Sequence, residues 1–129
     1  MNGILLDTNA LLWVLAGDED LGDDAQTQLA ATGPVHFSAV SVLEITIEEI
    51  LGRLEVPGEV PDAAKQAGMV ELPFRSAHAS GLKEFPALAR HDPFDRMLLS
   101  QAHSDGLLLC TSDRHLLALG FEWVIDARR

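Results

Sequence analysis

The sequence contains a single cysteine and no long run of apolar residues. Cys110 cannot form an internal disulfide, and its place in the apolar segment 107–111 predicts a buried, reduced thiol, which favours the cytoplasm. A membrane-spanning helix needs about 20 apolar residues, which no segment provides. The N-terminus also lacks the basic region of a secretory signal. We therefore expect a cytoplasmic protein that does not associate with membranes.

Basic residues are few as well. Nine Lys and Arg residues stand against twenty Asp and Glu residues, which gives a formal net charge of −11. This balance argues against binding nucleic acid through a broad basic patch. It suits a basic protein partner, or an acidic pocket in which metal ions meet phosphate groups. For the acidic cluster at 18–24, the simpler interpretation is that it keeps the protein soluble.

Several familiar catalytic motifs are absent. The sequence has no Ser/His/Asp set, no glycine-rich phosphate loop, and no cysteine or histidine pair at zinc-binding spacing. It also has no internal repeat, low-complexity segment or flexible linker. Because a chain of 129 residues buries roughly two-thirds of its unfolded surface, we expect one domain over residues 1–129.

The segment 4–6 is wholly apolar and is followed by Asp7. Such a run without polar alternation is typical of a strand covered on both faces, as in parallel α/β sheets. Ligands bind beyond the carboxyl ends of these strands, so Asp7 is a candidate site residue. It is equally placed to cap the helix 10–16. The segment 107–110 repeats the pattern and is followed by two hydroxyl residues and Asp113.

The rest of the chain alternates short strands with helices. Strands are predicted at 4–6, 35–37, 69–72, 107–110 and 123–125. Helices are predicted at 10–16, 23–31, 38–54, 61–68, 77–84, 93–106 and 114–119. This order predicts a three-layer α/β domain with a five-stranded, mostly parallel sheet.

Two interpretations of Glu44 are open. If Ser41 caps the helix 38–54, Ser41 and Glu44 form a capping box, and the glutamate needs no further function. If Ser38 is the cap, Glu44 lies in the second turn and is free to point into a cleft. The helix is expected to bury one face, formed by Leu43, Ile47, Ile50, Leu51 and Leu54.

The clearest helix start in the sequence lies at Asp92. This residue is a suitable cap, a proline follows it, and Asp95 falls in the first turn. The nearby histidines need no functional role. We interpret His36 as a strand residue, and His78 and His91 as surface residues.

Taken singly, Asp7, Glu44, Asp95 and Asp113 each have a capping or surface explanation. Together they indicate a site, because two follow buried strands and two lie near helix N-termini, where a doubly wound fold gathers polar groups. Right-handed crossovers allow the two strands that end in acids to be neighbours. Two carboxylates about 4 Å apart repel by roughly 4 kcal/mol at an effective dielectric of about 20. Protonation or a bound divalent ion relieves that repulsion.

A site made only of oxygen ligands favours Mg²⁺ or Mn²⁺ over zinc. An ion held by carboxylates orients and deprotonates water, binds a phosphoryl oxygen and stabilises the leaving group. The four acids therefore predict metal-assisted hydrolysis of a phosphodiester.

Four segments of the chain resemble the motifs of PIN-domain ribonucleases. Each motif alone is weak, but four in this order and spacing are specific, and the resemblance extends from Leu5 to about Ile125. Within that superfamily the chain is most similar to the VapC-type toxins of bacterial toxin–antitoxin pairs. The segments are 6–12, 38–45, 91–96 and 111–114.

The resemblance implies an endoribonuclease that depends on Mg²⁺ or Mn²⁺, with a parallel sheet of strand order 3-2-1-4-5. It implies that Asp7 and Asp95 are the principal metal ligands. Asp113 and Glu44 are expected to complete the catalytic site, directly or through water.

The resemblance also implies supporting groups and partners. Thr111 or Ser112 is expected to contribute a hydroxyl, and Asn9 to position the loop. The expected assembly is a homodimer that acts on RNA. Its expected inhibitor is a cognate antitoxin whose basic C-terminal segment covers the acidic groove.

One departure concerns the charge along the RNA path. Related sequences often carry a basic residue one turn beyond the motif glutamate, whereas this chain has Glu48 and Glu49. Arg90, Arg96 and Arg114 flank the predicted site. They have two interpretations, contact with RNA phosphates or pairing with neighbouring acids.

Two other functions remain as alternatives. One is a non-catalytic binding module that keeps the fold and sequesters a partner. The other is an aspartate-based phosphotransfer domain, such as a receiver or a haloacid-dehalogenase-like phosphatase. The residues disfavour phosphotransfer, because the only lysines, Lys65 and Lys83, precede the last strand, and Asn9 stands where the phosphatase motif has a second aspartate.

Overall fold

A five-stranded sheet forms the centre of the structure, a computed structural model that describes residues 3–129. Every pair of neighbouring strands is parallel, and the strand order is β3-β2-β1-β4-β5. The predicted α/β class and strand order are therefore confirmed. The strands are β1 (Ile4–Leu6), β2 (Val35–Ser38), β3 (Val70–Leu72), β4 (Leu108–Thr111) and β5 (Val124–Asp126).

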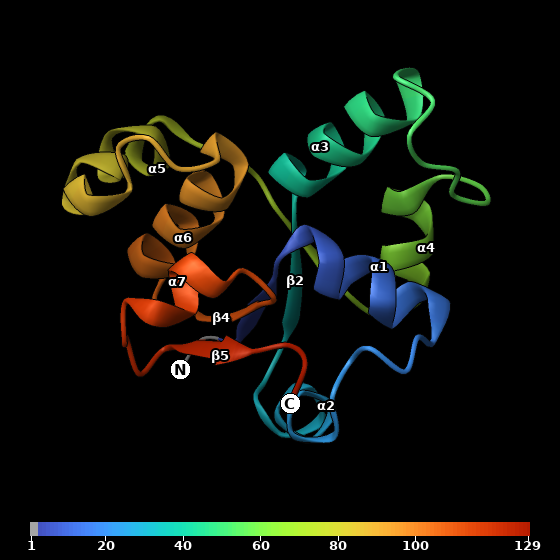
Figure 1. The fold of residues 1–129 in the computed structure, drawn as a ribbon. Helices are drawn as coiled ribbons and strands as arrows, with labels where there is room; N and C mark the ends of the chain where they lie inside the picture. Colours follow the sequence, from blue (N-terminus) through green and yellow to red (C-terminus); the bar gives the residue numbers. More distant parts are fainter. Residues whose placement is uncertain (1–2) are drawn as a thin grey trace.

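Helices connect the strands and cover both faces of the sheet. In Figure 1, α5, α6 and α7 lie on one side of the sheet, and α1 and α4 lie on the other. Within residues 3–129, no helix is long and apolar enough to cross a membrane. The helices are α1 (Thr8–Ala16), α2 (Asp23–Ala31), α3 (Ala39–Ile50), α4 (Val60–Gln66), α5 (Ser76–Ser80), the 3₁₀ turns η1 (Gly81–Glu84) and η2 (Pro86–Leu88), α6 (Pro93–Asp105) and α7 (Arg114–Ala118).

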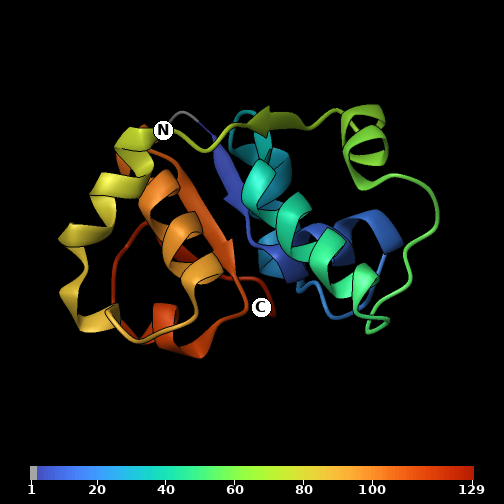
Figure 2. The same cartoon turned by 90° about the horizontal axis from the view of Figure 1, so that it is seen from above.

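The central strand β1 is fully buried because it lies between two hydrophobic cores. Ile4 and Leu6 belong to the core that includes α1, α2 and α4. Leu5 points to the opposite core, where it joins Leu98 and Leu99 of α6. Figure 2 shows these two groups of helices on either side of the strands. This placement brings the end of β1, and the acid that follows it, to the middle of the sheet edge.

The start of α3 decides between the two interpretations of Glu44. Ser38 is the N-cap, and its hydroxyl accepts a hydrogen bond from the backbone N–H of Val40 at 2.9 Å. Ser41 lies inside the helix, so it does not form a capping box with Glu44. Glu44 therefore lies in the second turn, where its carboxyl is available to a cleft.

The predicted buried face of α3 is wrong at three of its five residues. Leu43, Ile50 and Leu51 are 52%, 78% and 54% exposed, and the helix ends at Ile50 rather than at residue 54. The buried residues instead include Val40 and Ile45. The helix continues from the end of β2, and its last turns lie beyond the sheet (Figure 1). Apolar spacing identified residues that share a face, but it did not show what that face meets.

His78 is not a surface residue, contrary to the prediction. Its side chain is 0% exposed, and its Nδ1 accepts a hydrogen bond from the backbone N–H of Arg75 at 2.9 Å. Nε2 therefore carries the proton and lies 3.1 Å from Oδ1 of Asp105. The predicted helix 77–84 divides here into the short α5 and the 3₁₀ turn η1. His36, as expected, is a strand residue of β2.

Candidate active site

A polar cavity of about 300 Å³ lies beyond the carboxyl ends of β1 and β4. It occupies the switch point of the sheet, where the chain winds to one side from β1 and to the other from β4. All four predicted acids line this cavity, although they come from four separate parts of the chain. The lining residues are Asp7, Thr8, Asn9, Glu44, Asp95, Ser112, Asp113, Arg114 and Arg128.

Asp7 is buried and held by hydrogen bonds from two elements. Oδ1 accepts from the backbone N–H of Ala10 at 2.7 Å, so Asp7 does cap α1. Oδ2 accepts from the hydroxyl of Thr111 and the backbone N–H of Ser112, each at 2.8 Å. Burial raises the pKa of Asp7, and these hydrogen bonds oppose the rise. The capping and site interpretations are therefore compatible, because one carboxyl both caps α1 and lines the cavity.

Glu44 reaches the cavity from α3 and is anchored to α1. Its Oε1 accepts a hydrogen bond from the hydroxyl of Thr8 at 2.6 Å, and Thr8 also contacts Ser41 at 3.0 Å. Burial raises the pKa of Glu44, and the charges of Asp92 and Asp7 raise it further. Thr8 was not predicted as a site residue, although it directly follows Asp7 within the motif segment 6–12.

Asp95 and Asp113 form a close pair of acids across the cavity. Asp92 caps α6 as predicted, which places Asp95 in the first turn, and Asp113 caps α7. Burial, together with the hydrogen bond and charge of Asp113, raises the pKa of Asp95 to about 8. The pKa of Asp113 is lowered, because hydrogen bonds from Leu116 and Asp95 and the charge of His91 outweigh its burial. In the metal-free protein at neutral pH, Asp95 therefore keeps a proton that it shares with Asp113.

The predicted supporting residues connect the ends of β1 and β4. The amide of Asn9 donates a hydrogen bond to the hydroxyl of Ser112 at 3.1 Å. The hydroxyl of Thr111 donates to Asp7 and accepts from the backbone N–H of Asp113 at 3.0 Å. Thr111 therefore couples the positions of two of the four acids.

The arginines divide into those that line the cavity and those that do not. Arg114 lines it, whereas Arg90 and Arg96 do not. Arg96 donates to the backbone carbonyl of Ala89 at 3.3 Å. Among residues 3–129, no ion pair joins any of these three arginines to an acid.

Arg128 also lines the cavity, although it was not predicted as a site residue. Its guanidinium donates to the backbone carbonyl of Ser112 at 2.9 Å and lies 5.7 Å from the centre of the Trp13 ring. No motif marks this residue in the sequence. It reaches the cavity only because β5 pairs with β4 and carries the end of the chain there.

His91 lies at the site, contrary to the prediction. It was expected on the surface, but its side chain is largely buried beside the acids. Nε2 lies 3.2 Å from Oδ2 of Asp113 and 3.5 Å from Oδ2 of Asp95. The loop before α6 and the turn before α7 meet here, which the sequence did not indicate.

The acidic side of the cavity fits a hard divalent cation. Asp7, Glu44, Asp95 and Asp113 offer carboxylate oxygens, which Mg²⁺ and Mn²⁺ prefer as ligands. Burial is the main cause that raises the pKa values of Asp7, Glu44 and Asp95, so the cavity disfavours their charged forms when no cation is bound. A divalent ion held there would relieve that penalty, and it would supply the chemistry of metal-assisted hydrolysis.

Comparison with solved structures agrees with this fold. A toxin–antitoxin complex from Klebsiella pneumoniae matches with a TM-score of 0.67 at 18% identity, covering 96% of this chain and 97% of the other. VapBC2 from Rickettsia felis, bound to a promoter DNA fragment, matches with a TM-score of 0.66 at 13% identity, covering 95% and 96%. VapC20 from Mycobacterium tuberculosis, described as a toxin that cleaves the sarcin–ricin loop, matches with a TM-score of 0.56 at 21% identity, covering 95% and 98%.

Comparison of sequences gives the family. No curated protein matches the chain. The family model of the PIN domain matches residues 4–122, which include all four acids of the cavity. Because the match covers nearly the whole sequence, the chain belongs to the PIN-domain family.

Proposed function

We propose that residues 1–129 form one PIN domain that hydrolyses RNA phosphodiester bonds with Mg²⁺ or Mn²⁺ and acts as a VapC-type toxin. The observation that carries the proposal is the convergence of Asp7, Glu44, Asp95 and Asp113 on one cavity. Structural neighbours support the toxin role, because they include toxin–antitoxin complexes and a toxin described as cleaving the sarcin–ricin loop.

The four acids divide the work of holding the cation. Asp7 and Asp95 would be its principal ligands, and Asp113 and Glu44 would complete the site directly or through water. When bound, the cation activates water and stabilises charge on the phosphoryl oxygens and the leaving group. The hydrogen bonds of Asp7 fix its carboxyl before a cation arrives, so less freedom is lost on binding.

Two arginines compensate in part for the acidic surface. Arg114 and Arg128 line the cavity, and their guanidinium groups suit the geometry of phosphate oxygens. In this proposal they hold the RNA backbone, whereas Arg90 and Arg96 lie outside the cavity lining. Glu48 and Glu49 lie outside the cavity lining, and Arg53 lies 3.8 Å from Glu48 and offsets part of their charge.

The test of the proposed activity is RNA cleavage by the purified chain. We expect cleavage with added Mg²⁺ or Mn²⁺, no cleavage in EDTA, and recovery when the cation is restored. Asp7→Asn should be inactive, and Asp62→Asn, at an exposed position of α4, is the matched control that should cut like the parent. Cleavage that survives EDTA, or that Asp7→Asn retains, would contradict the assignment.

The strand order argues against a receiver-like phosphotransfer domain, but it does not argue against a non-catalytic binding module. A receiver-like phosphotransfer domain has the strand order 2-1-3-4-5, whereas this sheet has the order 3-2-1-4-5. A non-catalytic binding module would have the same fold as the nuclease, so a measurement of metal binding is needed to distinguish the two functions. Absence of Mg²⁺ and Mn²⁺ binding in calorimetry, with tight partner binding retained, would favour the module.

The proposed partner is a cognate antitoxin with a basic C-terminal segment. An apolar groove of about 280 Å³ runs between α1, the connector 51–59 and α4, and it is lined by Leu12, Trp13, Leu15, Leu54, Val56 and Val60, among others. The exposed leucine and isoleucine side chains of α3 add to the apolar surface. A segment with apolar and basic side chains suits this surface, because the chain carries a net charge of −11. The homodimer and the cytoplasmic location remain part of the proposal.

The antitoxin surface can be tested with the product of the neighbouring reading frame, which we expect to encode a small DNA-binding protein. Ile50→Asp should weaken the complex by at least about 10-fold, since burying an isoleucine side chain is worth about 1.5–3 kcal/mol. Ile50 is 78% exposed, so the fold should not change. Val70→Asp, on the edge strand β3, is the matched control. Equal affinity of both variants and the parent would exclude α3 from the interface.

A further inference from the structure

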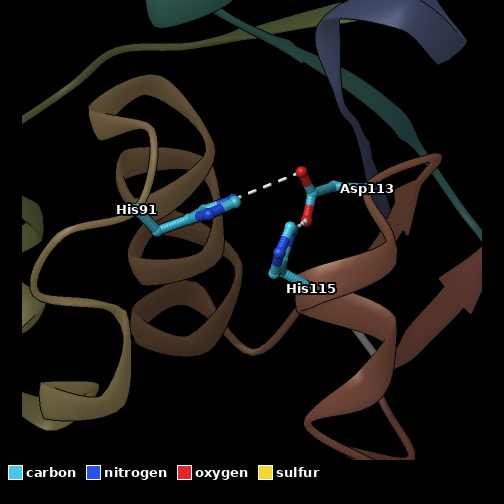
Figure 3. Close-up of side chains that lie close together, drawn as sticks. All are labelled: His91, Asp113 and His115. Atoms are coloured by element: carbon cyan, nitrogen blue, oxygen red, sulfur yellow. Dashed lines mark hydrogen bonds and ion pairs between the residues drawn. The ribbon is translucent and has the colours of Figure 1, made fainter.

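A second group of metal-ligating side chains lies beside the acid cavity. His91 comes from the loop before α6, Asp113 caps α7, and His115 lies in the first turn of α7. Nε2 of His91 is 3.2 Å from Oδ2 of Asp113, and Nδ1 of His115 is 3.9 Å from Oδ1 of Asp113. Figure 3 shows both imidazoles directed toward the same carboxyl group. The three ligand atoms all lie within 4.8 Å of one another.

These separations approach those of one tetrahedral ion, and a small movement of His115 would complete the set. With ligand bonds of about 2.0–2.2 Å, neighbouring ligand atoms of a tetrahedral site lie about 3.3–3.6 Å apart. The His91 contact is close to that range, and the side chain of His115, which is 75% exposed, is free to close the remaining distance. An exposed ligand also provides a route for an ion from solvent. Two imidazoles and a carboxylate leave the fourth position to water.

The chemistry of this ligand set differs from that of the acid cavity. Imidazole nitrogen favours Zn²⁺ and similar borderline ions, whereas the all-oxygen set of Asp7, Glu44, Asp95 and Asp113 favours Mg²⁺ or Mn²⁺. We propose that His91, Asp113 and His115 form a separate site for Zn²⁺. Asp113 is the only residue common to both ligand sets.

Sharing Asp113 makes the two sites antagonistic. A carboxyl held by Zn²⁺ between two imidazoles is no longer available to complete the acid site. Zn²⁺ therefore acts as an inhibitor of the nuclease, a consequence that rests on the proposed function, whereas the binding itself does not. The backbone N–H of Leu116 donates to Oδ1 of Asp113 at 2.9 Å and keeps the carboxyl near α7 in either state.

Binding is tested with Co²⁺, which reports a four-coordinate nitrogen and oxygen site by its visible absorption. We expect one equivalent of Co²⁺ to give such bands in the full chain, Zn²⁺ to displace it, and Mg²⁺ to leave it in place. His115→Ala should weaken binding by at least about 10-fold, because even outer-shell changes cost 10–100-fold. His103→Ala, at an exposed position of α6, is the matched control and should bind like the parent. A chain without the bands, or with the bands unchanged in His115→Ala, would overturn the site.

The regulatory consequence has its own measurement. RNA cleavage in excess Mg²⁺ is measured with and without one equivalent of Zn²⁺, and the rate with Zn²⁺ is divided by the rate without it. In the parent and in His103→Ala we expect Zn²⁺ to lower the rate, and so this ratio, by at least about 10-fold. In His115→Ala the ratio should stay near one. Co²⁺ binding without RNA cleavage would support the Zn²⁺ site and contradict the nuclease proposal. RNA cleavage without the Co²⁺ bands would support the nuclease proposal and contradict the Zn²⁺ site.

Discussion

The Asp95→Asn variant should lose RNA cleavage by more than about 100-fold and yet unfold at a higher temperature than the parent in metal-free buffer at pH 8. The loss follows from the proposed role of Asp95 as a metal ligand, since outer-shell changes alone cost 10–100-fold. The higher unfolding temperature follows from the pKa of Asp95, which burial and Asp113 raise to about 8. The asparagine amide carries no charge and still donates to Asp113, as the protonated carboxyl does.

The stability of this variant is measured as the thermal midpoint by circular dichroism in EDTA at pH 8. For a chain of this size, each kcal/mol added to the free energy of unfolding raises the midpoint by about 3–5 °C. Asp7→Asn is the informative comparison and should shift in the opposite direction. Its amide would meet the hydroxyl of Thr111 and the N–H of Ser112, which are donors, at a cost of about 1–3 kcal/mol. A lower midpoint for Asp95→Asn, or unchanged cleavage, would contradict the prediction.

The second large effect is a loss of stability of the metal-free parent as the pH rises from about 4 to about 8. In that range, folded Asp95 keeps a proton that the unfolded chain, with an ordinary carboxyl pKa near 3.8, has released. Because the folded state binds more protons, the free energy of unfolding falls with rising pH. Asp7 and Glu44 act in the same direction, since their pKa values are also raised. The lowered pKa of Asp113 acts only below this window.

The measurement is the thermal midpoint in EDTA across this pH range. Allowing for solvent around the partly exposed cluster, we expect a change of about 2 kcal/mol in the free energy of unfolding, or roughly 6–10 °C in the midpoint. Mg²⁺ at 100 times its dissociation constant should restore about 2.7 kcal/mol at pH 8 and much less at pH 5, where protons compete for the carboxyls. In Asp95→Asn the pH dependence should become shallow. A midpoint that rises with pH in the parent would show that the acids are not packed as described.

Local sequence patterns were sufficient for the position and type of most elements, whereas the strand order was predicted from the resemblance to PIN-domain ribonucleases. The runs that became β1 and β4 are apolar throughout because both faces of each strand are covered, so no polar residue interrupts them. The start of α6 was predicted for a similar reason, since its cap, proline and first-turn acid are consecutive residues. The likeness to PIN-domain ribonucleases rested on such short motifs, and the family match over residues 4–122 confirmed it.

Other features depended on what an element packs against. The spacing of apolar residues in α3 was helical, but Leu43 and Ile50 are exposed, and the last turns of the helix pass beyond the sheet (Figure 1). His78 was expected on the surface, yet it is buried through contacts with Arg75 and Asp105. In each case the sequence describes the residue and its neighbours along the chain, whereas burial depends on segments distant in sequence.

The sequence by itself determined which acids end strands or begin helices, because strand burial and helix capping act over a few consecutive residues. Only the tertiary structure decided that these acids share one cavity and that Glu44 is free of the cap. It also decided that His91 and Arg128 lie beside them. The parallel pairing of β1, β4 and β5 brings together side chains up to about a hundred residues apart in sequence. Interactions between residues close in sequence do not depend on that pairing, so local patterns do not reveal it.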